Sequence, residues 1–283
     1  MFNNKNISTT SKLLILVLVP WAILAIIFGF TDLEISKAVV GTNPIWAEEG
    51  TYYAHVPANM MIIIAVAILI GSFFEGIKIQ KLYGVMVGFF LNEFLTDFEL
   101  IIFRDTHAIL ADLYTIMGVI VFTTITLNKD WRNYIRFSIF IIIFATLLYS
   151  TVDIIKFLCG RVRFRDLSPD YSNYTPWFLP PGPSETNLSF PSTHTAQGWM
   201  VLPLIILVVN RKGKDFLKIL TFCFVIGWGT FVGISRVLIG AHYASDVLFS
   251  TGIAAVFTII LYKWFFLNIK RDRLCYFFEK KEQ

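Results

Sequence analysis

Two residues near the end of the chain, His242 and Asp246, are of types that together support nucleophilic or acid–base chemistry. If one helix covers both, a spacing of four residues places their Cβ atoms about 5–6 Å apart on one face. The carboxylate would then accept the Nδ1–H of the imidazole and leave Nε2 free as a nucleophile or base. A helix-surface pair or a capping interaction fits the same spacing. A metal site would need further ligands, which this cation-rich region does not offer.

A second segment with chemical potential reads Ser189-Phe-Pro-Ser-Thr-His194 and directly precedes an apolar run. Pro191 suits the first turn of a helix, and we expect Ser189 to serve as its N-cap. The backbone N–H groups of Ser192, Thr193 and His194 would then lie at an open helix N-terminus. Because such an end readily binds phosphate, the segment predicts a phosphate-binding helix start.

The composition places these segments in a membrane protein. Of the 283 residues, 56% are hydrophobic and 16% are charged, whereas a soluble domain has about 25% charged residues. An ordinary soluble domain and a disordered chain are therefore excluded. A net charge of +4 without a basic stripe argues against nucleic-acid binding. The three cysteines lie far apart in sequence and indicate neither a disulfide framework nor a zinc site.

Apolar runs supply the elements that must position the chemical residues. Each is about 15–21 residues long, near the ~20 that cross a bilayer as a helix, and none alternates as barrel strands do. We interpret the first run as a retained span, since it is too long for a signal peptide and no cleavage pattern follows. The run at 84–103 is the least clear because it contains three acidic residues. The runs lie near 13–30, 57–75, 84–103, 108–127, 135–153, 196–210, 216–234 and 247–267. The expected fold class is therefore all-α, a polytopic transmembrane helix bundle of about eight spans.

Basic residues in the loops after every second run predict the cytoplasmic side. They are Lys78, Lys81, Lys129, Arg132, Arg211, Lys212, Lys214, Lys270, Arg271 and Arg273. The opposite loop near 31–56 carries four acidic residues against one lysine. With this orientation, the segments after 135–153, before 196–210 and between the last two runs all meet the non-cytoplasmic face of a cell membrane.

A basic cluster interrupts this charge pattern on the predicted outer side. It consists of Lys156, Arg161, Arg163 and Arg165. A solvated loop would explain the cluster, and so would a cationic site for an anionic substrate at the membrane surface. For Arg161 and Arg165 in particular, steering of anionic head groups and a solvated position are both open.

Taken together, the three segments resemble the three-part signature of the type 2 phosphatidic acid phosphatase (PAP2) superfamily. Nine positions match in order and spacing: Lys156 and Arg163, then Pro191, Ser192 and His194, then Ser235, Arg236, His242 and Asp246. The resemblance covers about residues 150–267 and implies a PAP2-like six-helix core with extra N-terminal spans. We therefore divide the chain into unmatched N-terminal spans at 1–107, a catalytic core at 108–270 and a cytoplasmic tail at 271–283.

The resemblance implies a role for each matching side chain. His242 would attack phosphorus and form a phosphohistidine, with Asp246 orienting it, and His194 would protonate the leaving group. Lys156, Arg163, Ser192, Thr193 and Arg236 would bind the phosphoryl oxygens. Three fixed cations replace the metal ions of other phosphatases, so no metal or cofactor is expected. The implied substrate is a lipid phosphate or diphosphate in the membrane, and no protein partner is implied.

The chain departs from the family pattern at two positions. Phe164 follows Arg163 where the family usually has proline, and Thr193 stands where it usually has glycine. These departures leave open an inactive, lipid-binding relative. A lipid phosphotransferase is the alternative within the enzyme class. A lipid transporter is the alternative from another class, although the sequence shows no internal repeat.

Overall fold

The computed structural model describes residues 9–42, 44–74, 76–95 and 106–268. Every regular element within these ranges is a helix, which confirms the predicted all-α helix bundle. In chain order the elements are α1 Thr9–Val39, α2 Ile45–Tyr52, α3 Val56–Gly71, α4 Ile77–Leu95, α5 Thr106–Ile125, η2 Trp131–Tyr134, α6 Ile135–Cys159, η3 Phe164–Asp166, α7 Thr193–Trp199, α8 Leu204–Val208, α9 Phe216–Leu238, α10 Ala244–Tyr262 and η4 Lys263–Asn268.

Six helical segments are long and apolar enough to cross a membrane, and they coincide with six of the predicted runs. They are 10–39, 45–71, 106–125, 131–166, 216–238 and 244–267. Two predicted spans differ. The run at 84–103 corresponds to α4 and continues into 96–105, outside the described residues. The run at 196–210 is a shorter apolar segment, 193–208, made of α7 and α8. The total of eight spans therefore stays a prediction.

The segment from α7 to α8 is broken because of Pro203. Proline lacks the backbone N–H that continues an α-helix, and Pro203 directly precedes α8. Tight turns join the two helices, with the N–H of Met200 donating to the Gln197 carbonyl and that of Ile206 to the Pro203 carbonyl. These i→i−3 bonds are typical of such connections.

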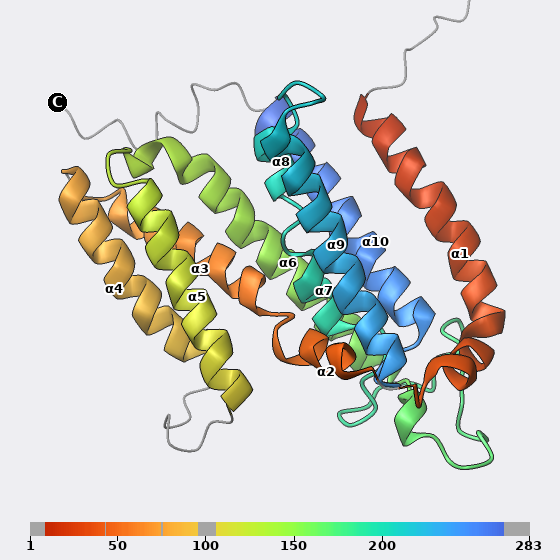
Figure 1. Ribbon diagram of the computed structural model, residues 1–283. Helices are drawn as coiled ribbons and strands as arrows, with labels where there is room; N and C mark the ends of the chain where they lie inside the picture. Colours follow the sequence, from red (N-terminus) through yellow and green to blue (C-terminus); the bar gives the residue numbers. More distant parts are fainter. Residues whose placement is uncertain (1–8, 43, 75, 96–105, 269–283) are drawn as a thin grey trace, which may run out of the picture.

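Helix α6 packs against α3, α7 and α10, beside which it lies in Figure 1. Its residues Phe140, Phe144 and Leu148 are fully buried, and the same apolar cluster includes Ala58 of α3 and Ala254 of α10. The close packing of these buried side chains determines which helices lie against α6. The last turn of α6 is therefore held at a defined place, and with it the start of the loop that carries the basic cluster.

A glycine ends α6 and starts that loop. Gly160 has a φ of 57°, the left-handed conformation that glycine adopts at low cost after a helix. A Cβ atom here would lie 2.0 Å from the carbonyl oxygen of Gly182. The close approach of these two backbone segments folds the loop 160–192 back onto the end of α6.

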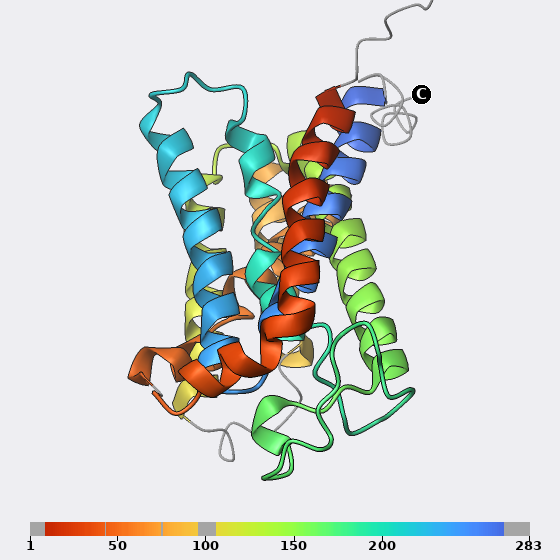
Figure 2. The ribbon, with the colours of Figure 1, turned by 90° about the vertical axis from the view of Figure 1, so that its right-hand side faces the viewer.

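The two ends of the bundle differ in the segments that they carry. Figures 1 and 2 show α2, η3, the loop 160–192 and the α9–α10 turn together at the lower end. The α5–η2 and α8–α9 connections, which contain basic residues of the predicted cytoplasmic side, lie at the upper end. The three chemical segments thus share one end of the bundle, opposite these basic loops.

The N-terminal helices pack directly against the C-terminal ones. In α1, Trp21 donates its indole N–H to the carbonyl of Leu248 in α10 at 3.1 Å. In α2, Gly50 approaches Ser235 of α9 so closely that a Cβ would lie 2.1 Å from its Oγ. The division at 107/108 stays a prediction, and the tail 271–283 lies outside the described residues.

Candidate active site

Backbone hydrogen bonds tie the three chemical segments to one another. The N–H of Arg165, after the first segment, donates to the carbonyl of Gly240 in the third segment at 3.1 Å. The N–H of Ser192, in the second segment, donates to the carbonyl of Asp246 at 3.2 Å. The structure therefore brings together all three segments that the sequence singled out, although they lie far apart in the chain.

The imidazole of His242 is held by a backbone carbonyl. Its Nδ1 lies 2.6 Å from the carbonyl oxygen of Ser189, and because a carbonyl only accepts, Nδ1 must carry the proton. In the neutral ring Nε2 is then unprotonated and has a free lone pair. The environment of His242 thus selects the tautomer that a nucleophile or base requires.

This geometry corrects the predicted pairing of His242 with Asp246. Helix α10 begins only at Ala244, so His242 lies in the preceding turn and the two residues do not share a helix face. Nδ1 is 3.5 Å from Asp246 Oδ2, longer than a normal hydrogen bond. The two side chains are neighbours, but Ser189 accepts the Nδ1–H in place of Asp246.

The carboxylate of Asp246 instead organises the groups around the imidazole. Its Oδ2 accepts the hydroxyl of Ser189 at 2.5 Å and the backbone N–H of Tyr243 at 2.9 Å. Its Oδ1 accepts from Nη1 of Arg161 at 2.6 Å. Ser189 in the loop and Tyr243 in the turn both lie next to His242, and both are bonded to Asp246. Asp246 therefore positions the imidazole indirectly.

Arg161 does not have the solvated position left open for it. Its side chain is 1% exposed, and it joins Asp246 to Asp32 of α1, whose Oδ2 accepts from Nη2 at 3.0 Å. Arg165, by contrast, is exposed. Asp32 is a residue of the site region that the sequence analysis missed. The signal was available, because an acidic residue at the end of an apolar span usually has a buried partner.

Buried cations surround the same region. Lys156 in the last turn of α6 is 8% exposed and Arg236 in the last turn of α9 is 4% exposed. Lys156 donates to the carbonyl of Leu188 at 2.9 Å. The buried Nε atoms of Arg163 and Arg236 have no hydrogen-bond partner within the part of the chain that the structure describes. Buried charged donors are normally paired, so these two atoms are candidate donors to an anionic acceptor.

These cations are close enough to influence one another. The positive charge of Lys156 interacts with those of Arg163 and Arg236. The charge of Arg236 interacts with that of Arg163 in the same way. Asp246 lies within the same range, but it is bonded to Arg161. Like charges repel one another, so this region carries an excess of positive charge that an anion would offset.

The helix start at the second segment differs from the prediction by a few residues. Ser192 is the N-cap of α7, and its hydroxyl oxygen accepts from the N–H of Thr195 at 3.3 Å. The predicted N-cap role of Ser189 and first-turn position of Pro191 are therefore wrong, because Ser189 bonds to Asp246 instead. The Ser192 N–H is also used, so Thr193 and His194 supply the first two N–H groups of the helix, which have no partner inside it.

His194 lies in the first turn of α7, beside the cations and His242. Burial first, and then the charges of Arg236, His242, Lys156 and His55, lower the pKa of its imidazole to about 2. His194 is partly exposed, whereas His242 is 2% exposed. Two imidazoles of different accessibility thus lie at one cationic site. His242 is suited to be a buried nucleophile, and His194 becomes a proton donor once a bound anion offsets the nearby positive charges.

Burial is the main cause that lowers the pKa of His242 to about 4. The positive charges of Lys156 and Arg236 act in the same direction, against the opposing effect of Asp246. Because this value lies well below neutrality, the imidazole is uncharged at neutral pH and its Nε2 lone pair is available.

His107 contacts α2 and takes no part in this arrangement of His194 and His242, whereas His55 is near enough for its charge to act on His194. The ring of His107 stacks on Tyr52 with centroids 4.0 Å apart, and its Nδ1 lies 3.2 Å from the hydroxyl of Tyr53.

Thr51, in the same helix α2, accepts a hydrogen bond from Nη1 of Arg236. Thr51 is a second residue that the sequence analysis missed, because its contact depends on how α2 folds under α9.

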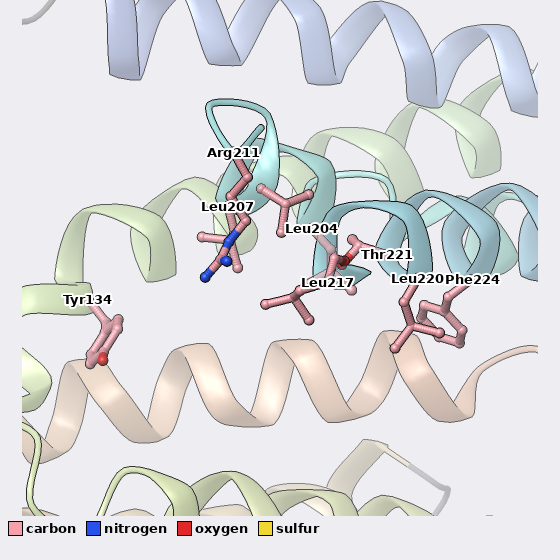
Figure 3. A pocket seen from close by; sticks show the side chains of 9 residues that line it. Tyr134, Leu204, Leu207, Arg211, Leu217, Leu220, Thr221 and Phe224 are labelled. Carbon is pink, nitrogen blue, oxygen red and sulfur yellow. The ribbon is translucent and has the colours of Figure 1, made fainter. Parts of the chain in front are cut away.

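A separate groove of about 650 Å³ lies at the opposite end of the bundle. Figure 3 shows its lining, which includes four leucines of α8 and α9 together with Tyr134, Arg211, Thr221 and Phe224. None of the predicted site residues lines it. The groove is apolar, as expected of a surface that faces lipid tails, and it does not belong to the cationic site.

Residues 137–270 match the family model of the PAP2 superfamily. This region contains every site residue predicted from the sequence. No curated protein and no solved structure matches the chain. This match assigns residues 137–270 to the PAP2 superfamily, whose members are generally phosphatases.

Proposed function

We propose that the protein is an integral membrane phosphatase that hydrolyses the phosphate or diphosphate of a lipid through a phosphohistidine at His242. The observation that carries this proposal is the bond between His242 Nδ1 and the Ser189 carbonyl. It leaves an unprotonated, neutral Nε2 beside three buried or half-buried cations. A general base alone would not need so many positive charges, whereas a nucleophile that attacks a phosphate does.

In the first step Nε2 of His242 attacks phosphorus, a P–N bond forms and the bond from phosphorus to the leaving oxygen breaks. His194, which takes up a proton when the bound phosphate offsets the nearby positive charges, gives that proton to the leaving oxygen, which departs as an alcohol or a phosphate. In the second step His194 accepts a proton from water, the water oxygen attacks phosphorus and the P–N bond breaks. Free phosphate and neutral His242 result, so atoms and charge balance over the cycle.

The cations stabilise the charge that develops on the phosphoryl oxygens. Arg163 and Arg236 offer Nε–H groups without partners among the described residues, and Lys156 adds a third charge. Fixed donors that need no reorganisation contribute most to such transition states. The side chain of Thr193, in place of the usual glycine, adds a hydroxyl at the helix start.

The position of the cationic site at the ends of membrane-length helices favours a lipid substrate over a soluble one. Helices α6, α9 and α10 each meet the cationic site with one end, and all three belong to segments long enough to span a bilayer. A head group at the site would therefore continue into tails along these helices. We further propose that this end of the bundle faces away from the cytoplasm, because the basic connections lie at the other end.

The test is a panel of lipid monophosphates and diphosphates offered to the purified protein in detergent containing EDTA. We expect phosphate release from at least one lipid at a rate that EDTA does not change, because Lys156, Arg163 and Arg236 supply the positive charge. A strict requirement for added Mg²⁺ or Zn²⁺ would contradict the mechanism. A labelled phosphate that appears on a second lipid, rather than in water, would identify a phosphotransferase.

A further inference from the structure

An acidic residue of the first helix is buried within the site region although it lies outside the family match. Asp32 of α1 is 0% exposed. Its Oδ1 accepts the backbone N–H of Ser245 at 2.9 Å, and its Oδ2 accepts from Nη2 of Arg161 at 3.0 Å and from the Ser245 hydroxyl. A charged side chain held by so many donors in a buried place is costly to assemble and calls for an explanation beyond packing.

Arg161 is fully engaged in holding carboxylates and loop atoms. Its Nη1 donates to Asp246 at 2.6 Å and to Ser245 Oγ at 2.8 Å, and its Nε donates to the Thr175 carbonyl at 2.9 Å. With the bond to Asp32, these contacts use four of the five N–H groups of the guanidinium. Its flat face covers the ring of Tyr243 at 3.9 Å. Arg161 therefore acts as a rigid link, and it is not available to bind substrate in the way that Arg163 and Arg236 are.

An unbroken set of contacts leads from Asp32 to the imidazole of His242. Asp32 bonds to Arg161, and Arg161 bonds to Asp246. Asp246 accepts the hydroxyl of Ser189 at 2.5 Å, and the carbonyl of Ser189 accepts the Nδ1–H of His242 at 2.6 Å. The backbone of Ser189 is fixed further, because its N–H donates to the carbonyl of Arg161 at 2.9 Å.

Helix α1 is anchored well enough to serve as a support for this set of contacts. Trp21 donates to the carbonyl of Leu248 in α10, and Trp177 of the loop 160–192 donates to the carbonyl of Ala25 in α1 at 2.8 Å. Asp32 lies further along the same helix. Helix α1 thus contacts both elements that Arg161 joins, the loop and the start of α10.

We propose that Asp32 is a positioning residue of the phosphatase site, which holds Arg161 so that Asp246 and Ser189 keep the imidazole of His242 aligned for attack on phosphorus. This inference rests on the proposed function. It assigns to α1 a part in the chemistry, and it makes the active site depend on a helix that lies outside the matched region.

The test compares Asp32→Asn with Ser36→Ala in the purified full-length protein. Asparagine keeps the size of the side chain but removes the charge that Arg161 bridges. Ser36 is a matched control, because it lies four residues further on the same helix, is also 0% exposed and has no hydrogen-bond partner for Oγ among the described residues. For Asp32→Asn we expect kcat to fall about 10- to 100-fold, since small misplacements of a reacting group have effects of this size. We expect KM to stay within about threefold, because the phosphate-binding cations are unchanged. Ser36→Ala should keep both constants.

A double variant, compared with its two single variants, distinguishes positioning from a general loss of stability. If Asp32 acts through Ser189, the variant Asp32→Asn/Ser189→Ala should be no more than about threefold slower than the slower of the two single variants. Independent effects would multiply instead. Should Asp32→Asn not fold, Asp32→Glu keeps the charge but displaces the guanidinium, and the folded protein should show the same selective loss of kcat.

The outcomes separate this inference from the proposed function. If the wild-type protein releases phosphate and a folded Asp32 variant keeps the wild-type kcat, or loses affinity alone, the inference is overturned and the function stands. Effects of Asp32→Asn and Ser189→Ala that multiply would overturn it as well. If the wild-type protein releases no phosphate from any lipid of the panel, the proposed function fails and this inference fails with it.

Discussion

Replacement of His242 by asparagine is expected to reduce phosphate release by about 10⁴-fold or more, the scale seen when a covalent nucleophile is removed. The amide nitrogen of asparagine takes the place of Nδ1 and can still donate to the Ser189 carbonyl, which the imidazole approaches at 2.6 Å. The variant therefore keeps the local hydrogen bond and loses only Nε2. Phosphate release from the best lipid of the panel, measured at saturating substrate, is the readout.

The matched control is His107→Asn. His107 is also in contact with aromatic residues and a hydroxyl, but it lies against Tyr52 and Tyr53 rather than at the cationic site. We expect this variant to keep turnover within about threefold. A folded His242→Asn protein with more than a few per cent of wild-type turnover would exclude His242 as the nucleophile.

Replacement of Arg236 by glutamine is expected to lower kcat/KM by about 10²- to 10³-fold, the effect of removing one fixed donor for transition-state charge. Arg236 is 4% exposed, and its Nε has no partner among the residues described. The same change should not lower the unfolding temperature of the substrate-free protein by more than a few degrees, because it also relieves repulsion from Arg163 and Lys156. This substitution would then lower kcat/KM strongly and change the unfolding temperature little.

Arg211→Gln serves as the control for a lost arginine. Arg211 lines the apolar groove at the other end of the bundle and bonds to Asp215 at 2.9 Å. Helix α9 separates the two arginines by about 30 Å, given a rise of about 1.5 Å per residue. Equal losses of kcat/KM in the two variants would contradict a specific role for Arg236, whereas a normal Arg211→Gln enzyme supports it.

Much of the fold follows from the sequence because apolar runs of membrane length are unambiguous in composition. Six of the eight predicted runs are helices of spanning length in the structure. The break between α7 and α8 is harder to predict, because Pro203 lies inside an otherwise continuous apolar run. A proline in such a run either kinks a helix or ends it, and the packing of the neighbours decides between these results.

The sequence indicates which side chains lie near one another, but not how they are connected. Spacing within a motif indicates which side chains belong together, and Lys156, Arg236 and His242 do lie within electrostatic range of one another. The partner of His242, however, is the carbonyl of Ser189, and a backbone carbonyl leaves no trace in the residue types. A carboxylate four residues away is the obvious partner in sequence, and Asp246 does lie beside the imidazole, with its Oδ2 3.5 Å from Nδ1.

The buried link between Asp32 and Arg161 illustrates a different limit. The two residues are separated by 129 positions, and nothing in either neighbourhood specifies the other. From charge alone, a solvated position and the steering of anionic head groups both stayed open for Arg161. Only the fold of the loop 160–192 over the ends of α1 and α10 brings the guanidinium between two carboxylates, where pairing makes the burial of all three charges tolerable.

The most direct test of the central claim is to trap the covalent intermediate. The protein is mixed with a lipid phosphate that carries ³²P, stopped within milliseconds by alkaline denaturation, and digested to locate the label. We predict an acid-labile, base-stable phosphoramidate on the peptide that contains His242, absent from His242→Asn and increased in wild-type protein when hydrolysis is slowed by low temperature. A label on another residue, or full turnover without any labelled protein at rates that the stopped reaction resolves, would contradict a phosphohistidine at His242.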